Sequence, residues 1–198
     1  MKAEPLYDSL DCTNALLGLG LSWGITSGLA SLNEKAQDKM ADIAARLCEK
    51  SGGEDKFLRQ ITVAWRITAP LFWWSEMDTY KVGTCAQSES TMHTLGKRDK
   101  FLSTDFEYGM SDDVLALLNS KLHSMKTCEE KDKESTFLLL KNLLPSGWLQ
   151  CRVWTANLAV MKNIWKQRHM HRLPQWRYIC NQFVKHTPLF LEGIYRSF

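Results

Sequence analysis

The sequence predicts an α+β protein, because a clear strand pattern lies among several helical patterns. Apolar and polar positions alternate in residues 59–68, which is the period of a strand with one buried face. Apolar residues recur at helical spacing in residues 34–50, and further helical patterns begin after Ser111, after Asn157 and near Pro174. The chain of 198 residues, 44% of them hydrophobic, is long enough to bury a sizeable core. We therefore expect a single domain over residues 1–198.

The N-terminal arm, residues 1–30, is rich in Gly, Ser and Leu and shows no clear period, so we expect it to be irregular. The core is expected to span residues 31–198. Its first helix, residues 34–50, is expected to end at Gly52-Gly53, because Gly readily adopts the backbone conformation that follows a helix.

The strand of residues 59–68 is expected to stop at Ala69-Pro70, and a short apolar and aromatic segment, residues 71–77, follows it. Pro is common in the first turn of a helix, so we expect a short helix there. Residues 79–110 carry little periodicity, and small polar residues dominate from 84 to 94. A polar stretch of this length inside a compact chain is typical of a functional or mobile segment.

The second half of the chain is predicted to be mainly helical. Ser111 can cap a helix, and residues 126–134 form a charged run that we expect to be solvated. Residues 137–144 are strongly apolar and predict a buried helix, closed by Pro145. Apolar residues at helical spacing define the last two helices: Leu158, Met161, Ile164 and Trp165, then Trp176, Ile179, Cys180 and Phe183.

Composition and charge exclude several classes of protein. The net charge of +3 and the pI near 8.5 are too small to indicate a nucleic-acid binder, which usually carries a concentrated basic face. None of the six Cys residues stand at C-x-x-C spacing, and His169 and His171 would point apart on a helix, so no metal site is expected. No apolar run approaches the roughly 18 residues that span a bilayer. We expect a cytoplasmic protein with reduced thiols and no membrane partner.

Basic residues cluster late in the chain, with seven of them between positions 162 and 177. They indicate either a solvated helix end, where cations are favoured, or an anion site. Arg168 stands seven residues after Met161 and four after Ile164, so it shares their inward side of the helix. An inward guanidinium needs an anionic partner, and Arg binds phosphate with a bidentate fork. Arg168 is therefore the first candidate for a phosphate-binding residue.

A second candidate region is residues 80–93, which offer hydroxyl groups and Lys81 near an expected helix end. Such groups could hold the phosphate and sugar of a nucleotide, although an ordinary Ser/Thr-rich loop has the same composition. The chain contains no Gly-x-Ser-x-Gly elbow, no Walker loop and no Gly-x-Gly-x-x-Gly motif, so no catalytic residue is identified.

Two blocks of sequence are together similar to one family. The first is Ile61-Thr62-Val63-Ala64-Trp65-Arg66-Ile67-Thr68-Ala69-Pro70-Leu71-Phe72, and the second combines Leu144-Pro145, Trp154-Thr155-Ala156-Asn157, Asn163 and Arg168. Their order and spacing resemble the strand ending in Ala-Pro and the Leu-Pro, Thr-x-Asn and Leu-Arg series of the flavin-dependent thymidylate synthases. The resemblance covers roughly residues 35–190. It implies a small antiparallel sheet packed with long helices, as in that family.

The family's signature, Arg-His-Arg followed by a Ser, helps to bind flavin and nucleotide, and it is altered here. The matching place reads Thr79-Tyr80-Lys81, in which only Lys81 keeps a cationic group. The family's nucleotide-contacting Glu, Ser and Arg match Gln87-Ser88-Glu89-Ser90-Thr91, and the Arg is missing. Lys141 and Arg168 match two nucleotide-binding Arg positions, and Asn163 matches a flavin-facing Asn. Arg59 replaces a His at the strand start.

The resemblance therefore implies a set of site residues. The expected nucleotide-binding residues are Arg168, Lys141, Gln87, Ser88 and Ser90. The expected cofactor-binding residues are Thr79, Tyr80, Lys81 and Asn163. The family also implies a homotetramer with sites at subunit interfaces, FAD as cofactor, methylenetetrahydrofolate as one-carbon donor and dUMP as substrate.

The altered signature bears on which of these functions is kept. Each hydrogen bond to a charged group is worth roughly 1.5–3 kcal/mol, so the loss of two Arg forks weakens flavin binding more than mononucleotide binding. Two functions stay open: a FAD-dependent methyltransferase of the thymidylate synthase type, and a non-catalytic nucleotide-binding sensor or sequestering protein on the same scaffold. A structural protein that kept only the scaffold is the third alternative.

Overall fold

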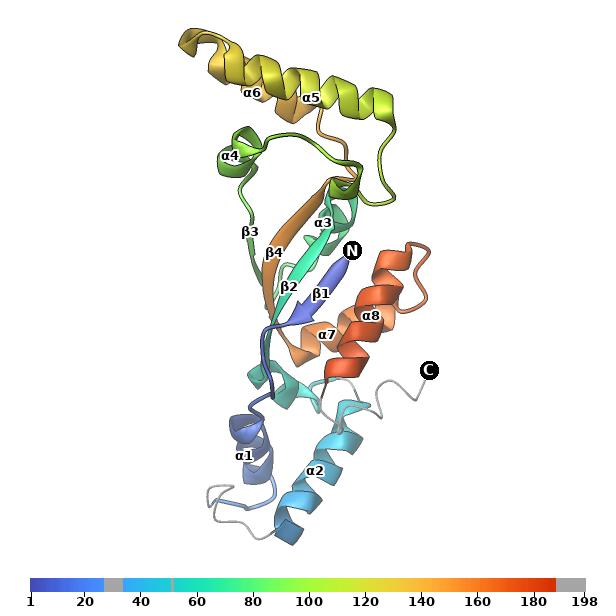
Figure 1. The fold of residues 1–198 in the computed structure, drawn as a ribbon. Helices are drawn as coiled ribbons and strands as arrows, with labels where there is room; N and C mark the ends of the chain where they lie inside the picture. Colours follow the sequence, from blue (N-terminus) through green and yellow to red (C-terminus); the bar gives the residue numbers. More distant parts are fainter. Residues whose placement is uncertain (27–33, 51, 188–198) are drawn as a thin grey trace. The chain divides into compact units, whose positions relative to one another are not determined.

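The computed structural model describes residues 1–26, 34–50 and 52–187, which form two compact units (Figure 1). The first unit comprises Met1–Lys2, Ile67–Thr79 and Gln87–Val153. The second comprises Ala3–Arg66, Tyr80–Ala86 and the chain from Trp154 onward. The expectation of a single domain remains a prediction.

The described strands form a small antiparallel sheet in the order β1-β2-β4-β3. The strands are β1 Lys2–Pro5, β2 Thr62–Pro70, β3 Cys85–Ser88 and β4 Leu149–Asn157. Hydrogen bonds flank the β2–β4 pair, from Leu158 N to the Ile61 carbonyl and from Leu71 N to the Trp148 carbonyl. With the helices described below, this sheet confirms the α+β class.

Strand β2 confirms the alternation predicted for residues 59–68, with shifted ends. Val63, Trp65 and Ile67 are buried, whereas Thr62 and Arg66 are exposed. The strand begins later than expected, because Lys56–Gln60 forms a 3-10 helix, η2, that includes Arg59. It continues through Pro70, whose missing N–H does not prevent its use as the last strand residue.

Helix α3, Leu71–Met77, has the bounds that the sequence predicts, and Pro70 is its N-cap. Its residues Trp73, Trp74 and Met77 are buried. Short elements follow in the polar stretch: α4 Thr91–Thr94, η3 Leu95–Lys97 and η4 Ser103–Asp105, besides strand β3.

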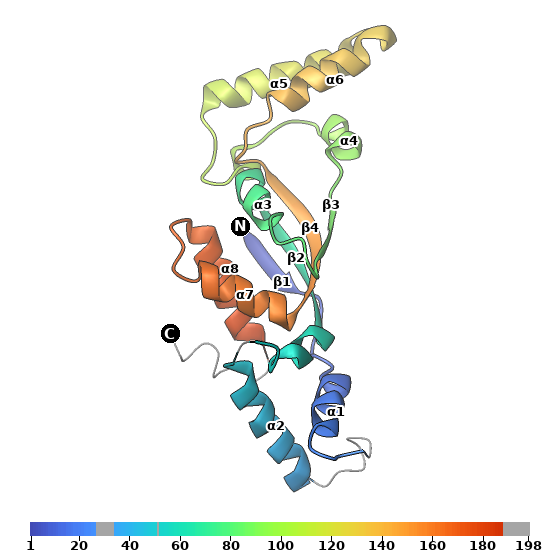
Figure 2. The ribbon, with the colours of Figure 1, turned by 180° about the vertical axis from the view of Figure 1, so that it is seen from behind.

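The long helices of the first unit are α5, Asp112–Thr127, and α6, Lys133–Asn142, joined through the 3-10 turn η5, Glu130–Asp132. Figures 1 and 2 show α5 and α6 side by side. Leu118 and Leu122 of α5 and Leu140 of α6 belong to one core cluster with Phe101, Phe106 and Trp148.

The prediction that residues 137–144 form a buried helix is wrong for part of this segment. Leu138 is 49% exposed and Leu139 is 46% exposed. The physical reason is that a helix buries only the face that meets its neighbour, so consecutive apolar residues cannot all point inward. Leu140 is buried, and Phe137, Leu143 and Leu144 are half-buried against the core cluster.

The second unit contains four α-helices among its described residues. They are α1 Thr13–Leu21, α2 Glu34–Cys48, α7 Leu158–Arg168 and α8 Pro174–His186. Helices α2, α7 and α8 confirm the periodic patterns of the sequence, and α7 and α8 lie side by side in both views (Figures 1 and 2). Phe183 of α8 stacks on Trp154, with ring centroids 6.0 Å apart, and meets the edge of Trp65.

The structure differs from the expected irregular arm of residues 1–30. Strand β1 and helix α1 lie in it, and residues 27–30 are outside the described residues. The physical reason is tertiary: Leu6 N, just after β1, donates to the Ala64 carbonyl of β2 over 2.8 Å, and Ala15 and Leu19 of α1 are buried.

Candidate functional site

One part of the candidate site is a cluster at the C-terminal end of α7, in the second unit. Arg168 Nε donates a hydrogen bond to Tyr80 Oη over 2.9 Å, and the Tyr80 hydroxyl donates to Gln167 Oε1 over 2.8 Å. Gln167 Nε2 donates in turn to Asn163 Oδ1 over 3.0 Å. The structure thus links Tyr80 and Asn163, two expected cofactor residues, with Arg168, an expected nucleotide residue.

Aromatic rings hold the Arg168 guanidinium in place. Its Cζ atom lies 4.8 Å from the ring centroid of Trp176 and 5.8 Å from that of Tyr80, and the residue is half-buried. Such contacts between a guanidinium and a ring face are attractive. The cation is therefore oriented before any ligand arrives, which favours recognition of a planar or anionic group.

His171 completes this cluster, with Nε2 2.9 Å from Arg168 Nη1. The backbone N–H of Leu173 points at the other ring nitrogen, Nδ1, over 3.2 Å. A neutral imidazole has one acceptor nitrogen, and a guanidinium can only donate. We assign the hydrogen bond to the shorter contact, in which His171 Nε2 accepts from Arg168.

The segment after Tyr80 runs back along α7 towards its N-terminal end. Thr84 Oγ1 donates to the Tyr80 carbonyl over 2.5 Å and closes a turn. Gly83 within this turn has φ +72°, and a Cβ added to it would stand 3.1 Å from Asn157 Nδ2 and 3.4 Å from Val160 Cγ2. Gly83 is needed both for its backbone conformation and for this close approach.

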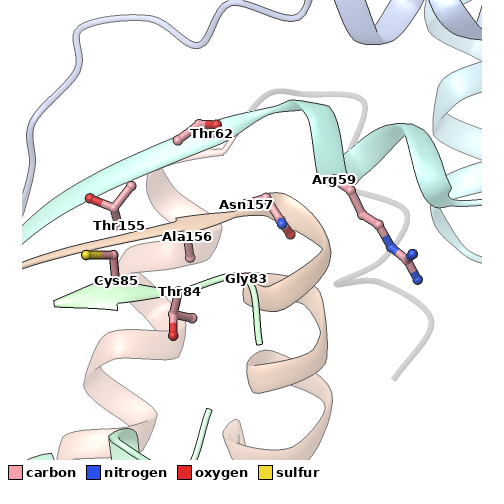
Figure 3. A pocket seen from close by; sticks show the side chains of 8 residues that line it. All are labelled: Arg59, Thr62, Gly83, Thr84, Cys85, Thr155, Ala156 and Asn157. Carbon is pink, nitrogen blue, oxygen red and sulfur yellow. The ribbon is translucent and has the colours of Figure 1, made fainter. Parts of the chain in front are cut away.

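A pocket of 280 Å³ lies beside Gly83 (Figure 3). It is lined by Arg59, Thr62, Gly83, Thr84, Cys85, Thr155, Ala156 and Asn157. The pocket joins the segment that follows the altered signature to the Thr-x-Asn block of β4. Residues 155–157 belong to the second block of the family resemblance, and residues 83–85 closely follow the altered signature.

Asn157 has a structural task at this pocket. Its Oδ1 accepts a hydrogen bond from Val160 N over 3.1 Å and so caps α7. Arg59 is exposed in η2, and Figure 3 shows its side chain extending away from the strands. The exposed pocket wall is mainly apolar, three Thr residues and Asn157 supply its polar groups, and the Arg59 guanidinium stands at its edge.

The remaining expected site residues of the first unit are mostly exposed. Gln87 and Ser88 lie on β3 and are exposed, and the Ser90 carbonyl accepts from Thr94 N and Oγ1. Lys141 is exposed on α6, with Nζ 3.5 Å from the Met92 sulfur. Their side chains are accessible to a ligand.

The three positions of the altered signature are divided between the units. Thr79 is in the first unit, where its hydroxyl donates to the Glu76 carbonyl over 2.7 Å. Tyr80 and Lys81 are in the second, and Lys81 is exposed. The structure therefore brings together Tyr80, Asn163 and Arg168 from the expected set, and places Thr79, Gln87, Ser88, Ser90 and Lys141 in the other unit.

Sequence reasoning missed several members of this cluster. Trp176 carries a core pattern in α8, and that pattern concealed its contact with Arg168. The sequence presents His171 as one of the late basic residues and as an unsuitable metal ligand, and it does not predict the contact with Arg168. Gln167 lies four residues after Asn163 in α7, and this helical spacing was the available signal for their hydrogen bond.

Two buried thiols lie near charged groups of the second unit. Burial raises the pKa of Cys180 to about 12, and the nearby Arg168 cation opposes this shift. Burial likewise raises the pKa of Cys48 to about 12, with Lys162 opposing it. Cys85, at the pocket, is exposed.

Within residues 1–26, 34–50 and 52–187, no group of three or more His, Cys, Asp or Glu residues is placed to hold a metal ion. In the same described ranges, none of the helices has both the length and the apolar character needed to cross a membrane.

No family model and no curated protein matches this sequence. Solved structures do match. A thymidylate synthase X from Helicobacter pylori, with FAD and dUMP, has a TM-score of 0.72 at 11% identity, covering 100% of this chain and 98% of that chain. A second H. pylori structure, a flavin-dependent thymidylate synthase complexed with FAD and dUMP, has a TM-score of 0.69 at 12% identity, covering 95% and 94%.

A third structure is a UMP/dUMP methylase from Streptomyces cacaoi bound with 5-Br dUMP. Its TM-score is 0.66 at 11% identity, and the match covers 98% of this chain and 94% of that chain. Identities this low show the fold and not the activity. The described chain has the α+β fold of the flavin-dependent thymidylate synthases.

Proposed function

We propose that this protein binds a pyrimidine deoxyribonucleoside monophosphate, such as dUMP, and that Arg168 is part of its binding site. The observation that carries the proposal is the contact between Tyr80 and Arg168. It joins the altered signature to the second block of resemblance, and within the same unit residues 83–85 and 155–157 line one pocket.

The chemistry of the site suits a mononucleotide. The hydroxyls of Thr62, Thr84 and Thr155 can bond the neutral edges of a base or a sugar. Arg168, in the same unit as this pocket, supplies a cation for a phosphate. The volume of 280 Å³ lies just below the usual range for ligand pockets, roughly 300–1,000 Å³.

The similar structures point to the same class of ligand. All three were solved with a uridine nucleotide, dUMP or its 5-bromo derivative, whereas FAD is named for two of them. The nucleotide is thus the ligand common to these proteins, and it is the one that we carry over to this chain.

The side chains at the altered signature do not fit the two phosphates of FAD. The Thr79 hydroxyl donates to a backbone carbonyl of its own helix end, and the Tyr80 hydroxyl is bonded to Gln167 and Arg168. Neither carries a charge, and Lys81 offers a point charge without a fork. We therefore propose nucleotide binding without a resident flavin, and no step of one-carbon transfer is assigned.

Assembly and location are part of the proposal and rest on the resemblance. We propose a homotetramer in the cytoplasm, with sites completed between subunits. Native mass spectrometry of the purified chain tests the tetramer directly, and a monomer at micromolar concentration would contradict it.

The proposed ligand is tested by calorimetric titration of dUMP into the desalted protein, wild type and Arg168→Ala. We expect the variant to bind at least about tenfold more weakly, a change of about 1.4 kcal/mol. Arg46→Ala on α2 is the matched control, because Arg46 is exposed and its Nε bonds only weakly to the Asp42 carbonyl, over 3.4 Å. It should bind as the wild type does.

Two results would contradict the proposal. If the wild-type protein binds neither dUMP nor UMP, the proposal of nucleotide binding is wrong. If Arg168→Ala binds dUMP with the affinity of the wild type, Arg168 is not part of the binding site. An absorbance spectrum of freshly purified protein, with and without added FAD after desalting, tests the flavin. We expect no retained flavin band. A retained band would favour the FAD-dependent methyltransferase over a nucleotide-binding protein without flavin.

A further inference from the structure

A second polar network lies in the first unit, and it touches both ends of residues 79–90, the segment that contains most of the site residues implied by the resemblance. Its centre is Arg152 on β4, whose side chain is 14% exposed. Gln150, two residues earlier on the same face of the strand, is 8% exposed. Neither residue belongs to the motifs that the sequence singled out.

Arg152 holds the first end of the segment. Its Nη1 lies 2.9 Å from Asp78 Oδ1 and 3.1 Å from Asp78 Oδ2, and Asp78 immediately precedes Thr79. The guanidinium also lies over the ring of Trp74, with Cζ 4.3 Å from the ring centroid. A charge-assisted bond and a ring contact together leave this guanidinium little freedom.

Gln150 holds the second end of the segment. Arg152 Nε donates to Gln150 Oε1 over 3.0 Å, which turns the amide nitrogen towards the backbone of Glu89. Gln150 Nε2 donates to the Glu89 carbonyl over 2.9 Å, and Glu89 N donates to the Cys151 carbonyl over 2.9 Å. Trp74 Nε1 donates to the Gln150 carbonyl and so ties α3 to this strand.

We propose that Arg152 is a positioning residue for ligand binding, which acts through Asp78 and Gln150 to fix both ends of residues 79–90. The inference rests on the proposed function, because Ser88 and Ser90, on either side of Glu89, are nucleotide-binding residues that the resemblance implies. Arg152 itself touches the protein and not the ligand. Because Arg152 orients the nearly buried Gln150 amide, this amide has one favourable pattern of hydrogen bonds. That pattern fixes the distance between Asp78 and Glu89, the two ends of the segment.

The test combines amide hydrogen exchange with dUMP titration in the variant Arg152→Met. Met keeps apolar contact with Trp74 and removes the guanidinium. We expect exchange of the Glu89 amide to accelerate about tenfold. We also expect dUMP affinity to fall about fivefold, measured well below the unfolding temperature, which matches the loss of about one hydrogen bond.

A matched control exists in the same unit. Arg98 pairs with Asp105 over 2.5 Å and lies 4.8 Å from the ring centroid of Trp148, so it has the same kind of environment as Arg152. Arg98→Met should lower the unfolding temperature, yet leave exchange at Glu89 and dUMP affinity unchanged. A merely structural role for Arg152 would make the two variants behave alike.

The variant Gln150→Glu distinguishes the hydrogen bond between Arg152 and Gln150 from the one between Gln150 and Glu89. It keeps an acceptor for Arg152 and removes the donor to the Glu89 carbonyl. It should accelerate exchange at Glu89 as Arg152→Met does, and it supplies the test if Arg152→Met does not fold. Unchanged exchange at Glu89 in both variants overturns the positioning role, whatever dUMP does. Failure of the wild type to bind dUMP overturns the proposed function, while the exchange result still decides whether Arg152 holds the segment.

Discussion

Arg168 and Tyr80 stand 88 positions apart in the sequence and are joined by a hydrogen bond of 2.9 Å from Nε to Oη. The Tyr80 hydroxyl donates a hydrogen bond to Gln167 Oε1, so it acts as acceptor and donor at once. Tyr80 stands where the resembling family has the His of its signature. The tyrosine thus connects the altered signature to a cation that the resemblance assigns to the nucleotide.

Tyr80→Phe tests what this hydroxyl contributes to the fold. The ring contact with Trp176, at 5.9 Å between centroids, is kept, whereas Arg168 and Gln167 each lose a partner. We expect the free energy of unfolding to fall by about 1 kcal/mol. Urea denaturation measures this, with Tyr178→Phe on the exposed side of α8 as the control. Equal stability of both variants would show that the hydroxyl network adds nothing.

Gly83→Ala tests the close approach of the pocket segment to α7. The variant must place a Cβ at φ +72° and 3.1 Å from Asn157 Nδ2, whereas Gly52→Ala meets φ +77° with nothing within 4 Å. The backbone conformation alone costs roughly 1–2 kcal/mol, so we expect Gly52→Ala to lose about that much and Gly83→Ala clearly more. Equal losses in thermal denaturation would mean that the segment shifts away from α7 without penalty.

Lys162→Met tests a nearly buried ion pair of the second unit. Lys162 Nζ lies 2.5 Å from Asp55 Oδ2 and 2.5 Å from the Lys50 carbonyl, and its side chain is 5% exposed. Removal of the ammonium leaves the Asp55 carboxylate without this partner, so we expect a loss of about 3 kcal/mol. The double variant Lys162→Met with Asp55→Asn should be more stable than the single one. Additive losses in denaturant titrations would argue against coupling.

Alkylation of the thiols tests which cysteines the fold buries. Cys85 is exposed beside the pocket, whereas Cys48 and Cys180 are fully buried and have pKa values raised to about 12. Alkylation needs an accessible thiolate, so iodoacetamide at pH 8 should label Cys85 first and the other two only in denaturant. Peptide mass spectrometry measures this order. Early labelling of Cys180 would contradict the packing of α8.

The same two thiols predict a loss of stability in alkali. Their pKa rises from an ordinary value of 9.0 in the unfolded chain to about 12 in the fold, because burial disfavours the thiolate. Their contribution is therefore complete below pH 9 and is lost as the pH rises from 9 towards 12, at about 1.4 kcal/mol per pH unit for each thiol. A Cys48→Ala/Cys180→Ala variant should show a shallower decline between pH 9 and 10.5 in urea denaturation. Parallel declines would contradict this assignment.

Local periodicity was sufficient to predict the helices and strands that bury one regular face. Helix α3 has its predicted bounds, α2 begins at its predicted residue, and α8 begins at Pro174 as the sequence indicates. In β2 the alternation identified the buried face, since Trp65 and Ile67 are buried and Arg66 is exposed. These elements are encoded locally, because each residue's place on a helix or strand follows from the spacing of its apolar neighbours.

Elements that depend on a partner were missed. Strand β3 is exposed at all four residues and carries no period, so only its pairing with β4 makes it a strand. The apolar run of α6 gave no sign of which side faces α5, and Leu138 and Leu139 are half exposed for that reason. Pairing and facing are relations between distant segments, and composition within one segment does not contain them.

The same division holds for the candidate site. The sequence alone determined the residue types, the helices that carry them and the resemblance that nominated Tyr80, Asn163 and Arg168 separately. The tertiary structure decided that these residues share one chain of hydrogen bonds, that Trp176 and His171 belong with them, and that Arg152 and Gln150 hold Asp78 and Glu89. The physical reason is that a hydrogen bond needs two groups within about 3 Å, and only the packing of α7, α8 and the sheet brings positions so far apart in the chain to that distance.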